Sequence, residues 1–477
     1  CGRTIDEPSA RGVAVMSGAA LSGTAPSGTA LGGTDLGGTA LSGPVLRGGA
    51  ISEASPPSRV RRSVTPAVRR QAPAQVVAEP GPVLLAGVGD GPSLSAHRAR
   101  FGALPTPDLD AVLSAVGAAA VAGRGGAGFP FARKVAAAAA GKRRHVVVVN
   151  LSEGEPASAK DTALALLAPH QILDGAEVVA RALRTKEIHV VTPQERPAVA
   201  DSIARAVDER AAAETRGGRG GPRWQLHSAA PGFVSGQAQA VLELLAGRPG
   251  LPVTAWQPEA ISGLDGRPTL LSNAETWAQV AAVLRLGPLR YAAHGTFAEP
   301  GTTLLTLPHE SDPDTAVVVE TAYGTPWVSV LGAAVDRPVL LGGFHGTWAG
   351  AGVLAGARVS RVDLQQQGLT LGAGVVLPLP TGQCPIAFTW EIVDYLAGQS
   401  AQRCGPCRNG LPALAAEVGR LATGNPAVSW TRIAELVGLV ERRGACAHPD
   451  GTARLVRSML TTFDDEVGMH LAGRCGR

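Results

Sequence analysis

Aromatic residues, charge of one sign and long apolar runs are all scarce in this 477-residue chain. Aromatic residues make up 4%, and 43 basic residues against 39 acidic ones leave a net charge of +4. This near balance does not indicate nucleic acid or an anionic membrane as a partner. No window of 18 uninterrupted apolar residues occurs, so we predict no transmembrane helix and expect any membrane contact to go through a partner protein.

Cysteine is also scarce, and its placement is more informative than its number. The chain has six cysteines, of which four lie beyond residue 400. So few cysteines in so long a chain exclude a secreted disulfide scaffold, and their clustering favours a metal or cluster site in a reducing compartment. We therefore expect a cytoplasmic protein that associates with a membrane only through partners. The sequence begins with Cys1, which fits an incomplete start or a processed lipoprotein end.

Glycine and proline, by contrast, are abundant, with 61 and 36 residues. Residues 1–80 contain an imperfect five-residue repeat, seen in Leu21–Ala25 and Leu36–Ala40. Its glycine, threonine and serine cannot bury enough apolar surface to offset the entropy of ordering, so we predict a disordered low-complexity tail. A small basic cluster at 59–70 is interpreted as a solvated linker, with a docking tail as the alternative.

Strand and helix patterns alternate from residue 82 to 290. Apolar runs at 146–149 and 188–192 predict buried strands. Helical periodicity covers 108–121, 161–184, 197–213 and 237–246. The alternation predicts an α/β domain with a mostly parallel sheet.

The sequence pattern changes twice after this domain. Between 295 and 375 the chain has short β segments, such as Thr303–Leu307 and Ala316–Glu320, separated by glycine and proline turns. From 385 to 477 helical patterns return in four segments with short connections, which predicts a helical bundle.

Two motifs in the α/β region carry the strongest functional signal. Gly123–Pro130 reads GRGGAGFP, and Asn150–Pro156 reads NLSEGEP. Four glycines within six residues let the backbone approach a ligand and turn its N–H groups onto a phosphate or a flat ring. A basic helix from Lys134 and the apolar strand Val146–Val149 lie between the motifs. This order places the second motif at a strand's carboxyl end, where open α/β sheets bind nucleotides, although the G-x-G-x-x-G spacing is absent.

These motifs resemble those of the flavin-binding subunit of the respiratory NADH dehydrogenase, which carries FMN, the NADH site and a 4Fe-4S cluster. Further matching segments follow in the same order: Lys160–Asp161, Pro169–His170, Ser262–Leu264, Gly266–Thr269, Ser272–Thr276, Leu341–Gly346 and Cys404–Gly410. The resemblance implies an FMN-binding α/β domain at 82–290, a small β-grasp (SLBB-like) domain at 295–375 and a helical iron–sulfur-binding domain at 385–477. It identifies the chain as a divergent member of this family.

By this resemblance, three separated segments would hold the FMN. The glycine loop with Lys134 would cradle it, the acidic loop after the strand would line the ring, and short donors at a helix start would hold the phosphate. The residues are Gly123, Arg124, Gly125, Gly126, Gly128, Phe129, Lys134, Asn150, Ser152, Glu153, Glu155, Gly236, Ser272, Asn273 and Thr276. We expect the two loops to face each other across a slot for the ring. Glu155, as the catalytic group beside the flavin, and Lys134, near its phosphate or N1 side, would tune the cofactor. The alternative is that the glycine loop is only a tight turn.

The segment that would place the nicotinamide nucleotide departs from the family. Relatives read Y-x-C-G-E-E-T-A where Phe233–Ala240 reads FVSGQAQA, so Gln237 and Ala238 replace both glutamates. The second phenylalanine that would sandwich the adenine falls near Ala137. The groups that remain are Phe129 and Glu155. NADH and a different reductant therefore both stay open as the donor.

The cysteine motif also keeps most of the family pattern. Relatives have the pattern S-C-G-x-C-x-x-C-R-E-G and a fourth cysteine further along the chain. This chain keeps Cys404, Cys407 and Cys446, whereas Ala401 stands in place of the first ligand. The C-x-x-C spacing favours a metal site over three ordinary buried thiols. His448 is the nearest alternative fourth ligand, either for a 4Fe-4S cluster, with a 3Fe-4S remnant as a variant, or for a Cys₃His zinc site.

The two remaining cysteines of this region are predicted to lie elsewhere. A helix over 386–401 would separate Cys384 from Ala401 by roughly 25 Å, at about 1.5 Å per residue. In an up-down bundle the three motif cysteines then gather at one end, and Cys384 and Cys475 at the other. We therefore predict that Cys384 and Cys475 lie closer to each other than to the cluster.

The resemblance implies an electron-transfer flavoprotein, an NADH dehydrogenase-like oxidoreductase. FMN would accept a hydride and pass single electrons to the iron–sulfur cluster, which would hand them to an acceptor protein. That acceptor would be ferredoxin-like or part of a membrane oxidoreductase. The alternatives are a non-catalytic flavin-binding protein and a zinc-stabilised scaffold.

Overall fold

The computed structural model describes residues 68, 71–216 and 221–476. The five-residue repeat and the basic cluster lie outside the described residues, so the tail stays a prediction there. Within the described part of the chain, no helix is long and apolar enough to cross a membrane.

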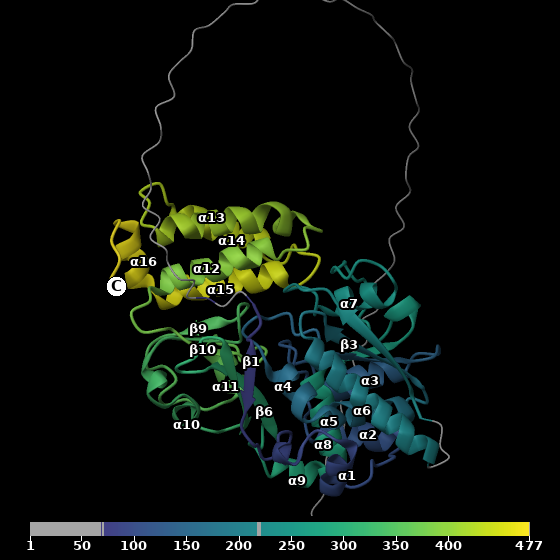
Figure 1. Cartoon of the computed structure of the whole chain (residues 1–477). Helices are drawn as coiled ribbons and strands as arrows, with labels where there is room; N and C mark the ends of the chain where they lie inside the picture. Colours follow the sequence, from purple (N-terminus) through teal and green to yellow (C-terminus); the bar gives the residue numbers. More distant parts are fainter. Residues whose placement is uncertain (1–67, 69–70, 217–220, 477) are drawn as a thin grey trace, which may run out of the picture. The chain divides into compact units, whose positions relative to one another are not determined.

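A parallel sheet of four strands in the order β4-β3-β2-β5 forms the centre of the α/β domain (Figure 1). Its strands are β2 (Val146–Asn150), β3 (Glu187–Pro193), β4 (Arg223–Ala229) and β5 (Thr269–Asn273). The chain runs from β2 outward to β3 and β4, and then returns to pair β5 with the other side of β2. The topological switch point therefore lies between β2 and β5, the place where open α/β sheets bind ligands.

The predicted strands at 146–149 and 188–192 are present as β2 and β3, whereas the buried strand β5 was not predicted. All five residues of β2 are buried, as expected for a valine-rich strand covered on both faces of a parallel sheet. The edge strand β4 escaped prediction because most of its residues are partly or fully exposed and no apolar run marks it.

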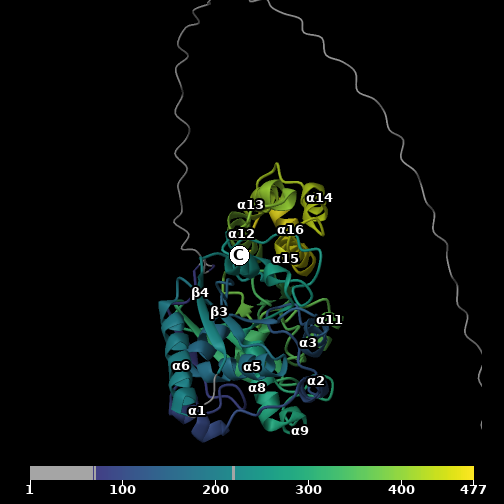
Figure 2. The same cartoon turned by 90° about the vertical axis from the view of Figure 1, so that its right-hand side faces the viewer.

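Helices cover the two faces of this sheet unequally (Figure 2). The helices are α1 (Leu94–Phe101), α2 (Leu109–Ala118), α3 (Phe131–Ala139), α4 (Lys160–Leu167), α5 (Pro169–Ala182), α6 (Pro197–Arg216), α7 (Ala238–Leu245), α8 (Ala274–Leu286) and α9 (Pro288–Ala292). Helices α5, α6 and α8 share one core with β2, β3 and β5, whereas α7 covers the opposite face. The single helix predicted over 161–184 is wrong: Pro169 lacks an N–H and begins a second helix at its first position.

Two small sheets, in the orders β1-β7-β6 and β10-β8-β9, follow this domain. Their strands are β1 (Gln75–Ala78), β6 (Thr302–Pro308), β7 (Thr315–Ala322), β8 (Val339–Leu341), β9 (Thr347–Ala349) and β10 (Val376–Pro378), with the short helices α10 (Trp327–Leu331) and α11 (Arg361–Gln366). β6 and β7 confirm the two predicted β segments. β1 corrects the expected end of the tail, because these four residues pair in parallel with β7. A strand that depends on so distant a partner leaves little local signal.

The C-terminal region is a bundle of α12 (Pro385–Gly398), α13 (Leu411–Ala422), α14 (Trp430–Val440), α15 (His448–Thr462) and α16 (Asp464–Leu471) (Figure 1). Five helices stand where four segments were predicted, because the last segment breaks at Phe463. One apolar core holds the helices together and includes Leu396, Leu414 and Val456. Val68 is also buried in this core, and its N–H donates to the Glu391 carboxylate at 3.1 Å.

Candidate functional site

The glycine loop is closed at its base and open at its tip. An isolated bridge pairs Ala122 with Pro130. Gly126 and Gly128 have φ of +107° and +64°, a backbone region that favours glycine. A Cβ added to Gly126 would meet nothing within 4 Å. The tip therefore presents backbone to open space.

Arg124 anchors the loop from below. Its side chain is buried, and its backbone N–H donates to Thr276 Oγ1 at 2.9 Å. Its guanidinium donates to the Thr302 carbonyl at 3.0 Å and to the Tyr323 hydroxyl. Burial lowers the pKa of Arg124, although Glu275 opposes the shift. The side chain thus fixes the loop to the protein interior.

The glycine loop and the acidic loop reach the same edge of the sheet. Asn150 ends β2 and pairs in register with Asn273, which ends β5. A Cβ on Gly125 would lie 3.9 Å from Cβ of Asn273, so the glycine loop packs over the end of β5. Neighbouring strands lie about 4.8 Å apart. The structure therefore brings both predicted motifs to the switch point.

A buried hydroxyl without a partner lies at the end of β2. Asn150 donates from Nδ2 to the Gly236 carbonyl at 2.9 Å and accepts the Ser152 N–H at 3.1 Å. These bonds bring the predicted residues Asn150, Ser152 and Gly236 together. Ser152 Oγ is buried and has no hydrogen-bond partner in the described part of the chain. Leaving such a group unpaired costs about 1–3 kcal/mol, so this position suits a polar atom of a ligand.

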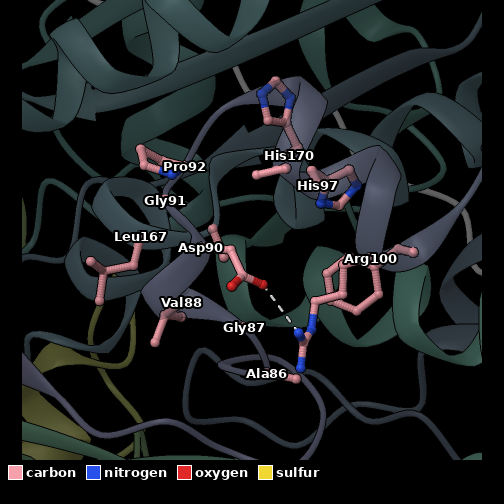
Figure 3. A pocket seen from close by; sticks show the side chains of 13 residues that line it. Ala86, Gly87, Val88, Asp90, Gly91, Pro92, His97, Arg100, Leu167 and His170 are labelled. Carbon is pink, nitrogen blue, oxygen red and sulfur yellow. Dashed lines mark hydrogen bonds and ion pairs between the residues drawn. The ribbon is translucent and has the colours of Figure 1, made fainter.

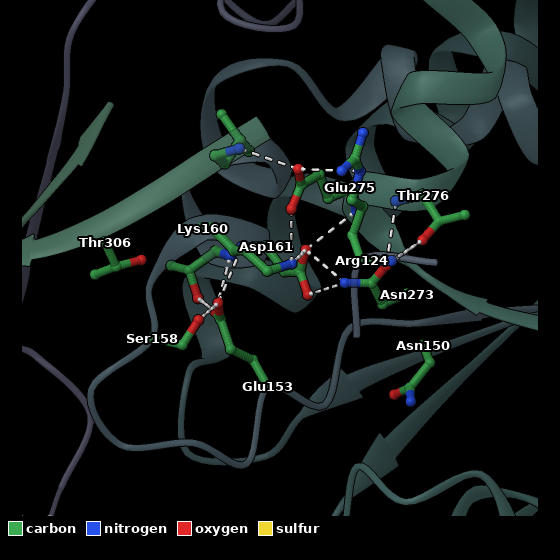
Figure 4. Close-up of polar contacts among 12 residues, drawn as sticks. Arg124, Asn150, Glu153, Ser158, Lys160, Asp161, Asn273, Glu275, Thr276 and Thr306 are labelled. Carbon is green, nitrogen blue, oxygen red and sulfur yellow. Dashed lines mark hydrogen bonds and ion pairs between the residues drawn. The ribbon is translucent and has the colours of Figure 1, made fainter. Parts of the chain in front are cut away.

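A buried network of charges lies behind these residues (Figure 4). Lys160 Nζ lies 2.8 Å from Asp161 Oδ1 and 3.2 Å from Glu275 Oε2. Glu275 also accepts the Leu304 N–H at 3.0 Å. Burial by itself would lower the pKa of Lys160, but the surrounding carboxylates outweigh it and raise that pKa. Figure 4 shows the network running from α4 to the start of α8, with Asn150 apart from it on β2.

Glu153 supports the acidic loop through bonds within the protein. Its carboxylate accepts the N–H groups of Asp161 and Thr162, both at 3.0 Å, and the Ser158 hydroxyl at 2.7 Å. It also pairs with Arg196 at 2.9 Å. Burial would raise the pKa of Glu153, but Arg196, Lys160 and the hydroxyls of Thr162 and Ser158 together outweigh it, and the pKa is lowered. The carboxylate expected beside the flavin ring is therefore used to hold the start of α4.

The side chains expected at the phosphate end are bonded within the protein as well. Asn273 caps α8 by accepting the Thr276 N–H at 3.1 Å. Lys134 Nζ lies 2.6 Å from the Leu271 carbonyl and 2.7 Å from Glu259. A phosphate would have to exchange some of these bonds or rely on backbone donors of the glycine loop.

Glu155 connects the acidic loop to the loop that follows β8. Its Oε2 accepts the Phe344 N–H at 2.8 Å, and its Oε1 accepts the Ala157 N–H at 3.2 Å. A Cβ added to Gly343, whose φ is +85°, would lie 2.5 Å from the same carboxylate, so only glycine fits there. Burial raises the pKa of Glu155 to about 7, although the two N–H donors act against it. Glu155 can therefore gain or lose a proton near neutral pH.

Phe129 keeps an exposed ring. It is 50% exposed, and the Arg133 guanidinium lies 5.8 Å from the ring centroid. An open cleft borders the glycine loop, lined by Gly128 together with Tyr323 and Arg361 of the following domain. Tyr323 and Arg361 were missed by sequence reasoning, because no local motif marks them and only folding brings them to the loop.

Another pocket of the α/β domain holds none of the predicted cofactor residues (Figure 3). It is lined by Asp90, His97 and Arg100, with His170 beside it, and Asp90 pairs with Arg100 at 3.2 Å. His170, part of a matched segment, accepts from Arg210 Nε at 3.1 Å. This histidine belongs to a buried polar network that supports α5 and α6.

Three cysteines gather at one end of the bundle. Cys407 is buried in the turn Pro406–Gly410 that begins α13, and Cys446 precedes α15. Burial, followed by the neighbouring thiols of Cys404 and Cys446, raises the pKa of Cys407 to about 12. The other two thiols of the set therefore lie near Cys407. Ala401, at the place of the lost ligand, packs against the bundle core.

His448 does not complete this set, which corrects the expectation. It is fully buried as the first residue of α15. Its Nε2 donates to the Leu396 carbonyl at 2.9 Å, and its Nδ1 accepts from His345 at 3.1 Å. Both ring nitrogens are occupied by bundle contacts, so neither faces the thiols as a free ligand.

Cys384 and Cys475 lie together, as predicted. Their sulfur atoms, with ligand atoms of Glu466 and His470, all lie within 4.8 Å of one another.

Comparison with known proteins agrees with this architecture. Residues 116–282 match the model of the Nuo51 FMN-binding domain. Residues 387–470 match the NADH-ubiquinone oxidoreductase-F iron–sulfur binding region. The chain belongs to the Nuo51-type flavoprotein family, as a divergent member. The two family models confirm the expected cofactors, FMN and an iron–sulfur cluster.

Individual members of this family are similar over most of the chain. The NADH-quinone oxidoreductase F-type protein of Mycobacterium bovis is 28% identical over 79% of this chain and 88% of its own length. The mitochondrial NADH dehydrogenase flavoprotein 1 of Dictyostelium discoideum is 27% identical over 75% of this chain and 78% of its own. A chain of an H₂-reduced NAD⁺-reducing NiFe-hydrogenase shares the fold, with a TM-score of 0.73, 24% identity and coverage of 84% of this chain and 68% of that one.

Proposed function

We propose that this Nuo51-type protein is an electron-transfer flavoprotein that oxidises NADH. FMN would bind at the switch point between β2 and β5, and when bound it supplies hydride acceptance and one-electron release. The observation that carries the proposal is the convergence of the open glycine loop with the unpartnered hydroxyl of Ser152. Such an arrangement leaves backbone donors and one buried hydroxyl for a flat polar ligand.

The candidate residues divide into ligand-binding and positioning groups. The backbone of Gly123, Gly125, Gly126 and Gly128, with Ser152, would contact FMN. The side chains that hold the loops in place are Arg124, Lys134, Asn150, Glu153, Asn273 and Thr276. Ser272 lies at the end of β5, and Gly236 borders Ser152. Glu155 would hold or release a proton beside the site, since its pKa is about 7.

Three thiols would bind the iron–sulfur cluster. Cys404, Cys407 and Cys446 supply ligands of the kind that 4Fe-4S clusters use, and a non-cysteine group would take the fourth position. Related chains are named as subunits of NADH-quinone oxidoreductase. We therefore expect a protein acceptor, either ferredoxin-like or part of a membrane oxidoreductase, and a cytoplasmic location with membrane association through that partner.

Ser152→Ala tests the flavin site. The unpaired hydroxyl destabilises the ligand-free protein, so we expect the variant to be at least as stable as the wild type. Its affinity for FMN should fall roughly tenfold, because one hydrogen bond of about 1.4 kcal/mol is lost. Ser95→Ala, on an exposed helix position, is the matched control. Titration of flavin-depleted protein with FMN measures both affinities. Equal affinities would contradict the assigned position.

NADH titration of anaerobically purified full-length protein tests the donor. Bleaching of the flavin absorption by NADH supports the proposal, whereas reduction by dithionite alone would indicate another reductant. Phe129→Leu should raise the KM for NADH by roughly 5- to 150-fold, since a base stacked on a ring contributes about 1–3 kcal/mol. Trp430→Leu removes an exposed ring of the bundle and should leave this KM unchanged.

Restoring the two replaced glutamates tests whether NADH binding can be strengthened. Gln237→Glu with Ala238→Glu restores the two carboxylates that relatives carry after Gly236. We expect the restored carboxylates to lower the KM for NADH, because charge-assisted contacts are stronger than neutral ones. An unchanged KM would separate these positions from nucleotide binding.

The second candidate function is a non-catalytic protein that keeps the fold. It is favoured by the intraprotein bonds of Asn273, Thr276 and Lys134, which occupy the expected phosphate donors. A colourless protein that contains zinc and lacks flavin and sulfide would establish this alternative.

A further inference from the structure

Four potential metal ligands from three chain segments meet at the far end of the bundle. Cys384 directly precedes α12, Glu466 and His470 lie one turn apart on α16, and Cys475 belongs to the tail after α16. Their ligand atoms all lie within 4.8 Å of one another. Figure 1 marks this end of the chain beside α16.

The separations of these atoms match those of a tetrahedral metal site. Cys384 Sγ lies 3.3 Å from His470 Nε2 and 3.9 Å from Glu466 Oε1. Glu466 Oε1 lies 3.3 Å from His470 Nε2 and 3.5 Å from Cys475 Sγ. Tetrahedral zinc, with bonds of about 2.0–2.3 Å, separates its sulfur, nitrogen and oxygen ligands by roughly 3.4–3.8 Å. Small shifts of these side chains would place one ion within bonding distance of all four ligand atoms.

A second contact orients the histidine for this role. The Nδ1 of His470 lies 3.0 Å from the Leu421 carbonyl, which can only accept a hydrogen bond, so Nδ1 carries the proton. Nε2 is the nitrogen that faces Cys384 and Glu466, and in the neutral ring it has the lone pair that a metal needs. Metal-binding histidines commonly have their second nitrogen fixed in this way. The ring is buried, which limits its freedom to turn.

The tail is also held against the ligand helix by its backbone. The Gly476 N–H donates to Glu466 Oε1 at 3.1 Å, and a Cβ on Gly476 would lie 2.6 Å from the other oxygen of the same carboxylate. The tail backbone therefore passes close to this carboxylate. These contacts hold Cys475 against the bundle, although it lies beyond the end of α16.

We propose that Cys384, Glu466, His470 and Cys475 bind one Zn²⁺ ion as a structural site, separate from the three-cysteine set. Two thiolates with one imidazole and one carboxylate suit zinc, whereas Ca²⁺ and Mg²⁺ require oxygen ligands. Zn²⁺ replaces the protons of the two thiols, which are released to solvent, and no electron is transferred. The ion closes a link from the start of α12 to the tail after α16.

The three-cysteine set lies beyond the other end of α12, a helix of 14 residues that spans about 21 Å. One ion cannot serve both groups. Zinc and iron should therefore be lost independently, and this independence distinguishes the zinc site from the flavin and cluster assignments.

Metal analysis of untagged full-length protein, purified without oxygen, tests the proposal. We expect one zinc per chain in the wild type and less than about one tenth of that in the Cys384→Ser, Cys475→Ser double variant, with iron and sulfide unchanged. Cys404→Ser is the matched control and should lose iron while it keeps zinc. Zinc that persists in the double variant, or that disappears only in Cys404→Ser, would overturn the proposal.

Two further measurements guard against a variant that fails to fold. Removal of zinc from the wild type by a chelator should lower the melting temperature of the bundle, and added Zn²⁺ but not Mg²⁺ should restore it. Co²⁺ in place of zinc should give the intense visible bands of a tetrahedral site and near-ultraviolet bands from thiolate, which weaken in His470→Gln. A zinc-free wild type with a Cys384–Cys475 disulfide would replace the metal by a covalent link and refute the site.

Discussion

The α/β domain and the helical bundle hold their candidate ligand groups by different means. In the α/β domain, the loops at the switch point rest on buried charges, among them Lys160, Glu275 and the Glu153–Arg196 pair. In the bundle, thiols lie at the two ends of an apolar core. The first arrangement satisfies most of its charged groups within the protein and leaves the Ser152 hydroxyl without a partner. The second gathers thiols with few other polar groups, so the stability of the two regions should respond differently to changes of charge, side-chain volume and metal content.

Among the variants that test this comparison, Lys160→Met should cause the largest loss of stability. It removes one partner of a buried charge network and leaves Asp161 and Glu275 facing each other, which we expect to lower the free energy of unfolding by about 3–5 kcal/mol. Arg432→Ala breaks an exposed pair with Glu435 in the bundle and should cost about 0–1 kcal/mol. Urea denaturation measures both. Similar losses for the two variants would remove the distinction between the regions.

Gly175→Ala should have the next largest effect. A Cβ there would lie 1.9 Å from the Trp277 carbonyl, because α5 and α8 pack backbone to backbone at this point. We expect a loss of about 1–3 kcal/mol from overpacking. Gly438→Ala, on an open face of α14, is the matched change and should be neutral or stabilising by up to about 1 kcal/mol. Thermal unfolding of both variants checks the pair, and a harmless Gly175→Ala would contradict the close helix contact.

His170 should make the α/β domain sensitive to moderate acid. Burial, assisted by Arg210, lowers its pKa from 6.5 to about 4, so the folded protein keeps it neutral while the unfolded chain protonates it. The unfolded state then binds more protons between these values, and the free energy of unfolding falls as pH falls from 6.5 to about 4. His170→Gln should flatten this fall. An identical pH profile in wild type and variant would show that other groups control it.

Glu155→Gln should have the smallest effect on stability. Burial raises the folded pKa of Glu155 to about 7 from 4.5, so the stability contributed by its protonated form is fully present below 4.5 and is lost as pH rises through 7. The amide mimics the protonated acid and can still accept the Phe344 N–H. We expect the variant to lose this part of the pH dependence and to differ little from wild type below pH 4.5. A large loss at low pH would indicate a different role for the carboxylate.

Local patterns predicted much of the fold and the location of the candidate site. The valines of β2, the glycine loop after Ala122 and the C-x-x-C spacing at Cys404 each concern neighbouring residues, so sequence alone reveals them. β1 and β4 were among the strands that sequence reasoning missed, because β1 depends on a partner about 240 residues away and β4 is an exposed edge strand. The bonds of Glu153 could not be predicted for a related reason: the motif shows a carboxylate but not the N–H groups from which it accepts hydrogen bonds.

The sequence by itself determined the family, the layered α/β core, the order of the motifs and the pairing of Cys384 with Cys475 at one end of the bundle. Only the tertiary structure decided which polar groups are already satisfied. It bonded His448 on both nitrogens, left the Ser152 hydroxyl without a partner and placed Glu466 and His470 beside the two cysteines. The physical reason is that backbone propensity and apolar periodicity are local, whereas hydrogen-bond and ligand geometry depends on atoms that folding brings together from distant segments.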